Sequence, residues 1–150
     1  AVNVALILRD NKVYVIELTG RVGANCLPEL VEINFGIESY KMIAAMAVGE
    51  NPLEYWENRN SKTTAGLARM ILSTEESGTL EDIKYTGEMD EDILEITFFK
   101  KTGDQIRKFV FSADCIGQII VKDSTLDECR AKINKIYKKR TTNSAEACFR

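Results

Sequence analysis

Two runs of β-branched and aromatic residues open the chain and constrain its fold more than any other feature. Residues 2–8 read VNVALIL and residues 13–18 read VYVIEL. Such residues favour strands, and the polar tetrapeptide 9–12 between them has the composition of a tight turn. The two runs therefore predict an antiparallel hairpin. Because both are nearly continuous in apolar residues, we expect the hairpin to be buried on both faces in a central sheet.

Turn and cap residues predict helices after the hairpin. Pro28 suits the first turn of a helix, and Gly36 suits the position that follows its end. Residues 39–48 repeat apolar side chains with the period of an α-helix. Residues 53–57 indicate a further short helical piece.

The second half of the chain has a different pattern. Short apolar runs predict strands at residues 66–73, 80–85, 93–100, 108–111 and 116–121. Residues 101–104 (KTGD) predict a hairpin turn. The last helix is expected over residues 126–139, where Thr125 and Glu128 fit a capping box. Its apolar side chains form one stripe, namely Leu126, Cys129, Ile133, Ile136 and Tyr137.

These patterns predict an α+β fold in two parts that join near residue 60. Residues 1–58 combine the hairpin with helices, residues 59–140 form a small β-rich domain with a terminal helix, and residues 141–150 form a flexible tail. The composition, with 45% hydrophobic and 29% charged residues, is typical of a globular protein rather than a disordered one.

The residue types that are missing exclude several kinds of chemistry. The chain has no histidine, so Ser-His and Cys-His catalysis and zinc sites that need imidazole are excluded. With 20 basic and 23 acidic residues the formal net charge is −3, and we expect no nucleic-acid partner. The basic side chains of the last helix are expected to form a solvated face.

The cysteines and the apolar runs bear on where the protein works. None of the four cysteines forms a Cys-x-x-Cys pair, and Cys26 and Cys129 fall within apolar patterns typical of free core thiols. We therefore expect a reduced, cytoplasmic protein. The longest apolar run, residues 42–48, is too short to span a membrane. No signal peptide is apparent, and the start at Ala1 indicates processing, a fragment or an experimental boundary.

One segment combines residue types that suit phosphate chemistry. Glu17, Thr19 and Arg21 have a spacing of two, so in an extended chain their side chains share one face. A carboxylate, a hydroxyl and a guanidinium in a row could hold Mg²⁺ against phosphate oxygens. The alternative interpretation is a structural ion pair between Glu17 and Arg21 at the end of a strand.

The same segment resembles a known family. Residues 3–21 (NVALILRDNKVYVIELTGR) are similar to the final metal-binding hairpin of ATP-grasp enzymes, which include carbamoyl-phosphate synthetase, biotin carboxylase and the amino-acid ligases. Residues 23–32 and 36–52 resemble the helices that follow this hairpin. Further segments resemble the small carboxyl-terminal domain of such ligases, namely residues 78–83, 114–120 and 124–129. The resemblance covers most of residues 3–139.

The resemblance implies roles for particular residues. Glu17 matches the carboxylate that bridges two Mg²⁺ ions on the phosphates of ATP. Arg21 matches the arginine that contacts phosphate or the acyl-phosphate intermediate, so the resemblance implies that it is both a catalytic and a cofactor-binding residue. Thr19 stands where the family usually has Asn as a second metal ligand. Ala5 stands where relatives often have an acidic or amide residue, and alanine cannot bind a metal.

The resemblance also implies what the protein does. It leads to the hypothesis of a carboxyl-terminal fragment of an ATP-dependent carboxylate–amine or carboxylate–thiol ligase, which acts through an acyl phosphate on a small carboxylate. Its partners would be the missing amino-terminal ATP-grasp segments, so the isolated chain is expected to be inactive. One alternative is a non-catalytic binding or assembly module, prone to form a homo-oligomer. Another is an unrelated α+β protein that shares only the hairpin.

Overall fold

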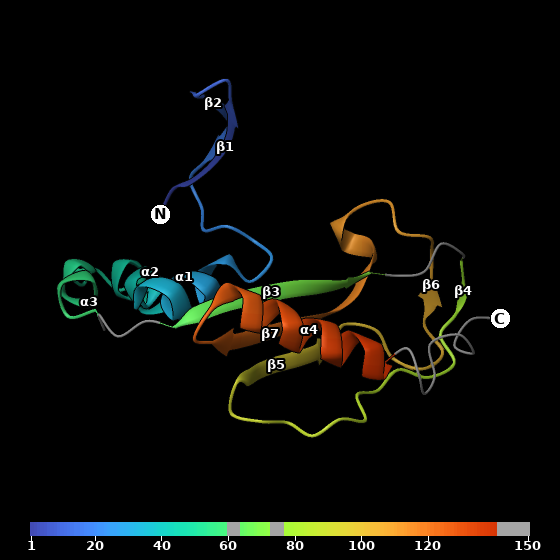
Figure 1. Ribbon diagram of the computed structural model, residues 1–150. Coiled ribbons are helices and arrows are strands. Elements are labelled where there is room, and N and C mark those ends of the chain that lie inside the picture. The colour runs from blue at the N-terminus through green and yellow to red at the C-terminus, as the bar shows by residue number, and fades with distance from the viewer. Residues whose placement is uncertain (60–63, 73–76, 141–150) are drawn as a thin grey trace. The chain divides into compact units, whose positions relative to one another are not determined.

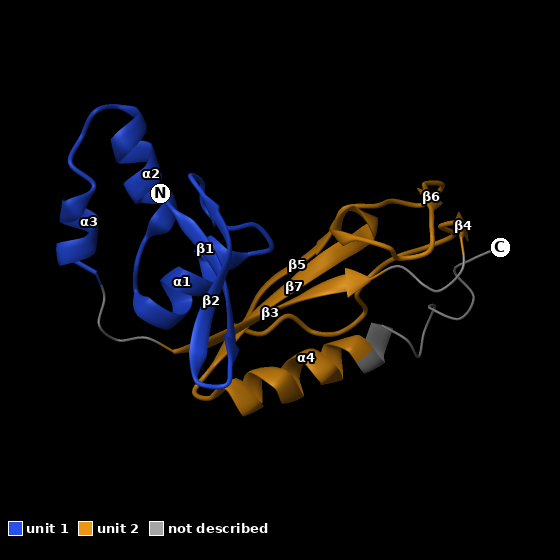
Figure 2. Ribbon diagram, turned by 90° about the horizontal axis from the view of Figure 1, so that it is seen from above, with its two compact units in different colours: residues 1–63 blue, residues 64–150 orange. Residues whose placement is uncertain are grey.

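The computed structural model describes residues 1–59, 64–72 and 77–140 (Figure 1). The chain has the expected mixture of helices and antiparallel sheets. It divides into two compact units, Ala1–Thr63 and Thr64–Arg150 (Figure 2). The predicted tail at residues 141–150 lies outside the described residues.

The first unit begins with the predicted hairpin. Strands β1 (Asn3–Arg9) and β2 (Lys12–Thr19) pair antiparallel as a two-stranded sheet. Asp10 and Asn11 join them with positive φ angles of 52° and 56°. Two successive residues of this conformation match the right-handed twist of the flanking strands, and Asp and Asn tolerate it better than most residues. The turn was therefore predictable from its residue types.

Three helices follow the hairpin in the same unit. They are α1 (Leu27–Phe35), α2 (Ser39–Ala47) and α3 (Leu53–Glu57). Pro28 lies in the first turn of α1, as expected. Gly36 ends this helix with a φ of 69°, and its N–H donates to the Glu32 carbonyl at 2.8 Å. The predicted start and end of α1 are thus confirmed.

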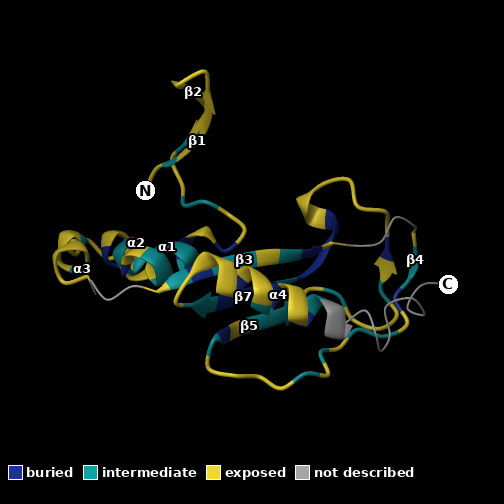
Figure 3. Cartoon of the chain, viewed as in Figure 1, coloured by how far each residue is buried: buried dark blue, intermediate teal, exposed yellow. Residues whose placement is uncertain are grey.

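The burial predicted for the hairpin is wrong for this chain. Apolar side chains of both strands are exposed, from 43% for Val4 to 72% for Leu8. Figure 3 shows β1 and β2 coloured almost entirely as exposed. The reason is that the two strands form a sheet of their own, and no other described strand pairs with either of them. An apolar sequence predicts that other residues will cover a strand. It does not show which part of a protein supplies those residues.

The second unit contains a three-stranded antiparallel sheet in the order β3–β7–β5. Its strands are β3 (Ala65–Leu72), β5 (Ile93–Phe98) and β7 (Cys115–Asp123). A smaller pair joins β4 (Gly78–Thr79) to β6 (Gln105–Ile106), and the 3-10 helix η1 (Ser112–Asp114) precedes β7. Helix α4 (Leu126–Arg140) lies against the larger sheet (Figure 1).

The predicted apolar stripe of α4 forms the core of this unit. Cys129, Ile133 and Ile136 are buried in one cluster with Ile119 and Val121 of β7. The capping box is also confirmed, since the Glu128 N–H donates to Thr125 Oγ1 at 3.2 Å. Leu126 belongs to the predicted stripe but is 48% exposed, because it lies in the first turn.

Two predicted strands are absent from the structure. Residues 80–85 form no strand beyond a single bridge at Leu80, although the Leu80 side chain is buried in the core. Residues 108–111 are also irregular. There the amides of Val110 and Phe111 donate to the Asp114 carboxylate at 3.0 and 3.1 Å. Because a side chain satisfies these N–H groups, they do not join a sheet.

Lys132 ties α4 to two other segments of the unit. Its Nζ lies 2.6 Å from Asp92 and 3.2 Å from Asp123, with Asp90 at 3.8 Å. Burial disfavours the ammonium, but the hydrogen bonds to Asp92 and Asp123 outweigh it and raise the pKa of Lys132. This lysine was expected on a solvated face, and the structure instead leaves only 17% of its side chain exposed.

We expect Lys132→Ala to lower the free energy of unfolding by about 2 kcal/mol, because it leaves neighbouring aspartates without a counter-charge. Urea denaturation of the 150-residue chain measures this. Lys135→Ala is the matched control, since Lys135 lies on the same helix and forms no ion pair with a described residue. Equal losses in the two variants would contradict a specific role for Lys132.

Candidate functional site

A β-bulge near the base of the hairpin determines where Glu17 lies. Ala5 pairs with Glu17 and Leu6 pairs with Val15, so Ile16 is an extra residue in β2. In a regular strand Val15 and Glu17 would share a face, since side chains alternate. The unpaired residue shifts this alternation. As a result Glu17 and Val15 lie on opposite faces of the hairpin.

The register sorts the side chains of the hairpin into two different faces, because residues directly opposite each other share a face. One face is entirely apolar and consists of Val4, Leu6, Leu8, Val13, Val15 and Leu18. The other face is mixed and carries Asn3, Ala5, Ile7, Arg9, Lys12, Tyr14, Glu17 and Thr19. The hairpin is therefore amphipathic, and its candidate site residues lie on the mixed face.

Glu17 and Thr19 share this face, as their spacing predicted. Thr19 Oγ1 lies 3.5 Å from the Asn3 carbonyl oxygen on the opposite strand, which is a weak contact. Glu17 is exposed, and its carboxylate forms no ion pair with any described residue. The alternative interpretation, a structural ion pair with Arg21, is thus not realised among the described residues.

Arg21 lies beyond the end of β2, in a bend. Its Nη1 donates to the neighbouring Val22 carbonyl at 2.8 Å, and the side chain is exposed. The structure therefore separates Arg21 from the strand that carries Glu17 and Thr19. The chain stops being extended at Gly20, and this is why a spacing of two does not carry the shared face as far as Arg21.

The loop after the site connects it to the helices of the same unit. A Cβ at Gly23 would lie 2.2 Å from Leu27 Cδ2, so glycine lets this loop pack against the start of α1. A cavity of about 320 Å³ lies beside it and is mostly apolar. It is lined by the base of the hairpin, by Val22 and Gly23, and by side chains of α1 and α2. The glycine therefore has a packing role here.

The described residues supply only part of a metal site. Glu17 offers a carboxylate and Thr19 a hydroxyl, which are oxygen ligands of the kind that Mg²⁺ accepts. Ala5, opposite Glu17, offers none. Within the described ranges no group of three or more acidic or cysteine side chains is placed to hold a metal ion. Further ligands would have to come from a nucleotide or from other protein segments.

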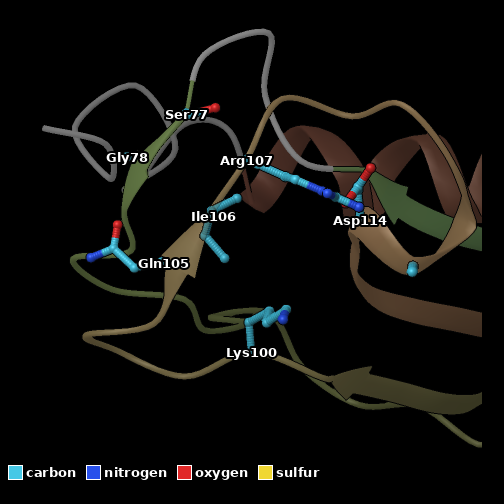
Figure 4. A pocket seen from close by; sticks show the side chains of 8 residues that line it. Ser77, Gly78, Lys100, Gln105, Ile106, Arg107 and Asp114 are labelled. Carbon is cyan, nitrogen blue, oxygen red and sulfur yellow. The ribbon is translucent and has the colours of Figure 1, made fainter.

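Sequence reasoning missed a second group of polar residues, which lines a cavity in the other unit. Lys100, Arg107 and Asp114 belong to it (Figure 4). These three residues form no motif in the sequence, so no signal there could bring them together. In the described part of the chain the cysteines are buried and form no disulfide, as expected of core thiols, namely Cys26, Cys115 and Cys129.

Comparisons with known proteins support the resemblance seen in the sequence. The chain is 62% identical to phosphoribosylglycinamide synthetase from Anaerococcus prevotii, with a TM-score of 0.85, and the match covers 92% of this chain and 35% of that one. It is 21% identical to an L-amino acid ligase from Bacillus licheniformis, with a TM-score of 0.74 over 92% of this chain and 34% of that one. The second likeness concerns the fold alone.

These structures are ATP-grasp enzymes, and the predicted resemblance and fold class are confirmed. The chain spans about a third of the length of either protein, and it matches a carboxyl-terminal ATP-grasp portion. No protein-family model matches the chain, and no curated protein does. Among the described helices none is long and apolar enough to cross a membrane.

We expect Glu17→Gln to change the free energy of unfolding of the 150-residue chain by no more than about 0.5 kcal/mol, because the carboxylate is exposed and has no ionic partner in the described structure. Thermal or urea denaturation measures this. A loss well above that value would restore the structural interpretation of this residue.

Proposed function

We propose that this chain is the carboxyl-terminal portion of an ATP-dependent carboxylate–amine ligase and supplies half of its active site. The observation that carries the proposal is the 62% identity to an ATP-grasp enzyme over 92% of the chain. The exposed Glu17 on the mixed face of the hairpin agrees with it. A carboxylate–thiol ligase would use the same first step.

The reaction would proceed in two transfers. An oxygen of the substrate carboxylate attacks the γ-phosphorus of ATP, and ADP leaves with the electrons of the broken bond. The amine nitrogen then attacks the acyl carbon and loses a proton, and inorganic phosphate leaves with the electrons of the broken C–O bond. When bound, Mg²⁺ neutralises charge on the phosphoryl group during transfer. The carboxylate of Glu17 and the hydroxyl of Thr19 are the groups of this chain that would hold it.

Arg21 would act on the anion rather than on the metal. Its guanidinium can donate paired hydrogen bonds to phosphate or acyl-phosphate oxygens, which stabilises the charge that develops there. Among the described residues, only the Val22 carbonyl accepts a hydrogen bond from this guanidinium. Its exposed position past the strand leaves the side chain able to reorient toward a ligand.

The partners of the chain would be the amino-terminal ATP-grasp segments, together with ATP and a small carboxylate. The apolar face of the hairpin supports the first of these, because burying each Val, Leu or Ile side chain contributes about 1.5–3 kcal/mol. The buried cysteines, which form no disulfide among the described residues, support a reducing, cytoplasmic location.

A second candidate is a non-catalytic assembly module. Ala5 favours it, because this residue lies directly opposite Glu17 and supplies no ligand. In that case the hairpin would serve contact between copies of the chain, as a homo-oligomer. The effect of Glu17 on turnover separates the two candidates.

In the longer protein that carries this segment, we expect Glu17→Gln to lower kcat by about 10²–10³-fold, since a neutral amide binds Mg²⁺ more weakly than a carboxylate. Steady-state assays of ATP- and amine-dependent phosphate release measure this.

The matched control is Glu57→Gln, which removes an exposed carboxylate from α3 and should leave kcat within about twofold of the wild type. Unchanged turnover in Glu17→Gln would favour the assembly module instead.

For the 150-residue chain alone we expect no change in melting temperature with millimolar Mg²⁺-ATP, because it offers only part of a metal site. A complete site at about 100 times its Kd would stabilise the chain by roughly 2.7 kcal/mol, a shift of several degrees. ATP with EDTA is the control. A magnesium-dependent rise would show that the chain holds a usable nucleotide site and would contradict the half-site proposal.

A further inference from the structure

The loop between β2 and α1 closes tightly onto the start of the helix that follows it. It comprises residues 20–26 and carries Arg21 near its beginning (Figure 1). A Cβ at Gly23 would lie 2.2 Å from Leu27 Cδ2 and 3.1 Å from both Cβ and Cγ of the same leucine. Because the shortest of these distances is too small for a real contact, a side chain at position 23 would have to displace Leu27 or the loop.

A tight turn brings Gly23 and Leu27 together. Its two central residues, Asn25 and Cys26, have positive φ angles of 57° and 63°. The Leu27 N–H donates to the Ala24 carbonyl at 3.3 Å, which closes the turn. Positive φ at both central residues is the pattern of a type I′ turn. Asparagine tolerates this conformation, whereas cysteine is uncommon in it.

Cys26 keeps its left-handed conformation because it is anchored on both sides. Its side chain is only 6% exposed, and its carbonyl accepts a hydrogen bond from the Leu30 N–H of α1 at 3.0 Å. A residue with an unfavourable φ persists only where the surrounding structure fixes it. The turn is therefore held by the packing of Cys26 and by the first turn of the helix.

The position of Arg21 depends on this loop. Arg21 lies two residues before Gly23, and among the described residues its guanidinium bonds only to the adjacent Val22 carbonyl, at 2.8 Å. That carbonyl belongs to the loop and moves with it. The backbone of the loop therefore determines which positions the guanidinium can reach. A displacement of about 1 Å in a reacting or charge-stabilising group can lower a rate by about 10²-fold.

We propose that Gly23 is a positioning residue for Arg21, because its close contact with Leu27 holds the loop where the guanidinium reaches the phosphoryl group. This inference rests on the proposed function, in which Arg21 stabilises charge on phosphate or acyl-phosphate oxygens. Gly20, in the same loop, differs from Gly23, since a Cβ there would have no described heavy atom within 4 Å. The requirement for glycine is therefore specific to position 23.

The test is a double-mutant cycle in the longer protein that carries this segment, with kcat for ATP- and amine-dependent phosphate release as the readout. We expect Gly23→Ala to lower kcat at least about tenfold and to leave the KM for ATP within about twofold. Arg21→Ala should lower kcat by about 10²–10³-fold. In that background Gly23→Ala should cost less than about twofold, because the group that it positions is gone. Similar losses in both backgrounds would show a general structural effect and overturn the proposal.

Leu27→Ala supplies the rescue, because it removes the Cγ and Cδ atoms that a Cβ at position 23 would meet. Only Leu27 Cβ then remains nearby, at 3.1 Å, and a small shift accommodates that contact. The double variant Gly23→Ala/Leu27→Ala should therefore return to within about threefold of the kcat of Leu27→Ala alone. Gly20→Ala is the matched control, with kcat within about twofold of the wild type. A failed rescue, or an equal loss in Gly20→Ala, would contradict the positioning role.

All variants are assayed well below their melting temperatures, so that a lower kcat does not reflect unfolded enzyme. The outcomes separate this inference from the proposed function on which it rests. If Arg21→Ala lowers kcat and Gly23→Ala does not, the positioning role alone is overturned. If Arg21→Ala leaves kcat unchanged, Gly23 has no catalytic group to position and the inference fails. Unchanged turnover in Glu17→Gln as well would overturn the proposed function.

Discussion

The apolar face of the β1–β2 hairpin is the constraint on which the first unit depends. An antiparallel pair with exposed valines and leucines along one whole face is marginally stable in water by itself. It becomes a stable element only when other chain covers that face. The chain spans 35% of the length of the ATP-grasp enzyme to which it is 62% identical. Under the proposed function, the apolar face would serve assembly and the mixed face would serve chemistry.

In the second unit, residues of the unit itself cover the apolar face of the sheet. Helix α4 places Cys129, Ile133 and Ile136 over the three-stranded sheet, so its apolar stripe is buried within the unit. The Lys132 ammonium adds contacts to the β7 end and to the segment before β5. The two units therefore differ in how far their apolar residues are covered: the second unit buries its own core, and the hairpin of the first unit leaves its apolar side chains exposed.

The sequence correctly predicted the turns and helix ends that depend on neighbouring residues. The Asp10–Asn11 turn, the cap at Gly36 and the capping box at Thr125 each depend on residues within one turn of the chain. The strands predicted at residues 80–85 and 108–111 do not form. The apolar side chain of Leu80 is buried by packing against distant residues, and the backbone amides of Val110 and Phe111 donate to the Asp114 side chain instead of to another strand. For the candidate site, spacing correctly placed Glu17 and Thr19 on one face. It could not show that the strand ends before Arg21, nor that the cavity residues Lys100 and Arg107 come together.

The unpaired Ile16 makes the two strands respond differently to a change in length. If Ile16 were deleted, Val15 and Glu17 would still oppose Leu6 and Ala5, and each face would keep its residues. A residue inserted into β1 opposite Ile16 would instead complete the ladder and rotate Glu17 onto the apolar face. The direction of the Glu17 side chain thus depends on the number of residues in β1 between Ala5 and Leu6 and not on the extra residue in β2, so an insertion that preserves every existing side chain could still reverse it.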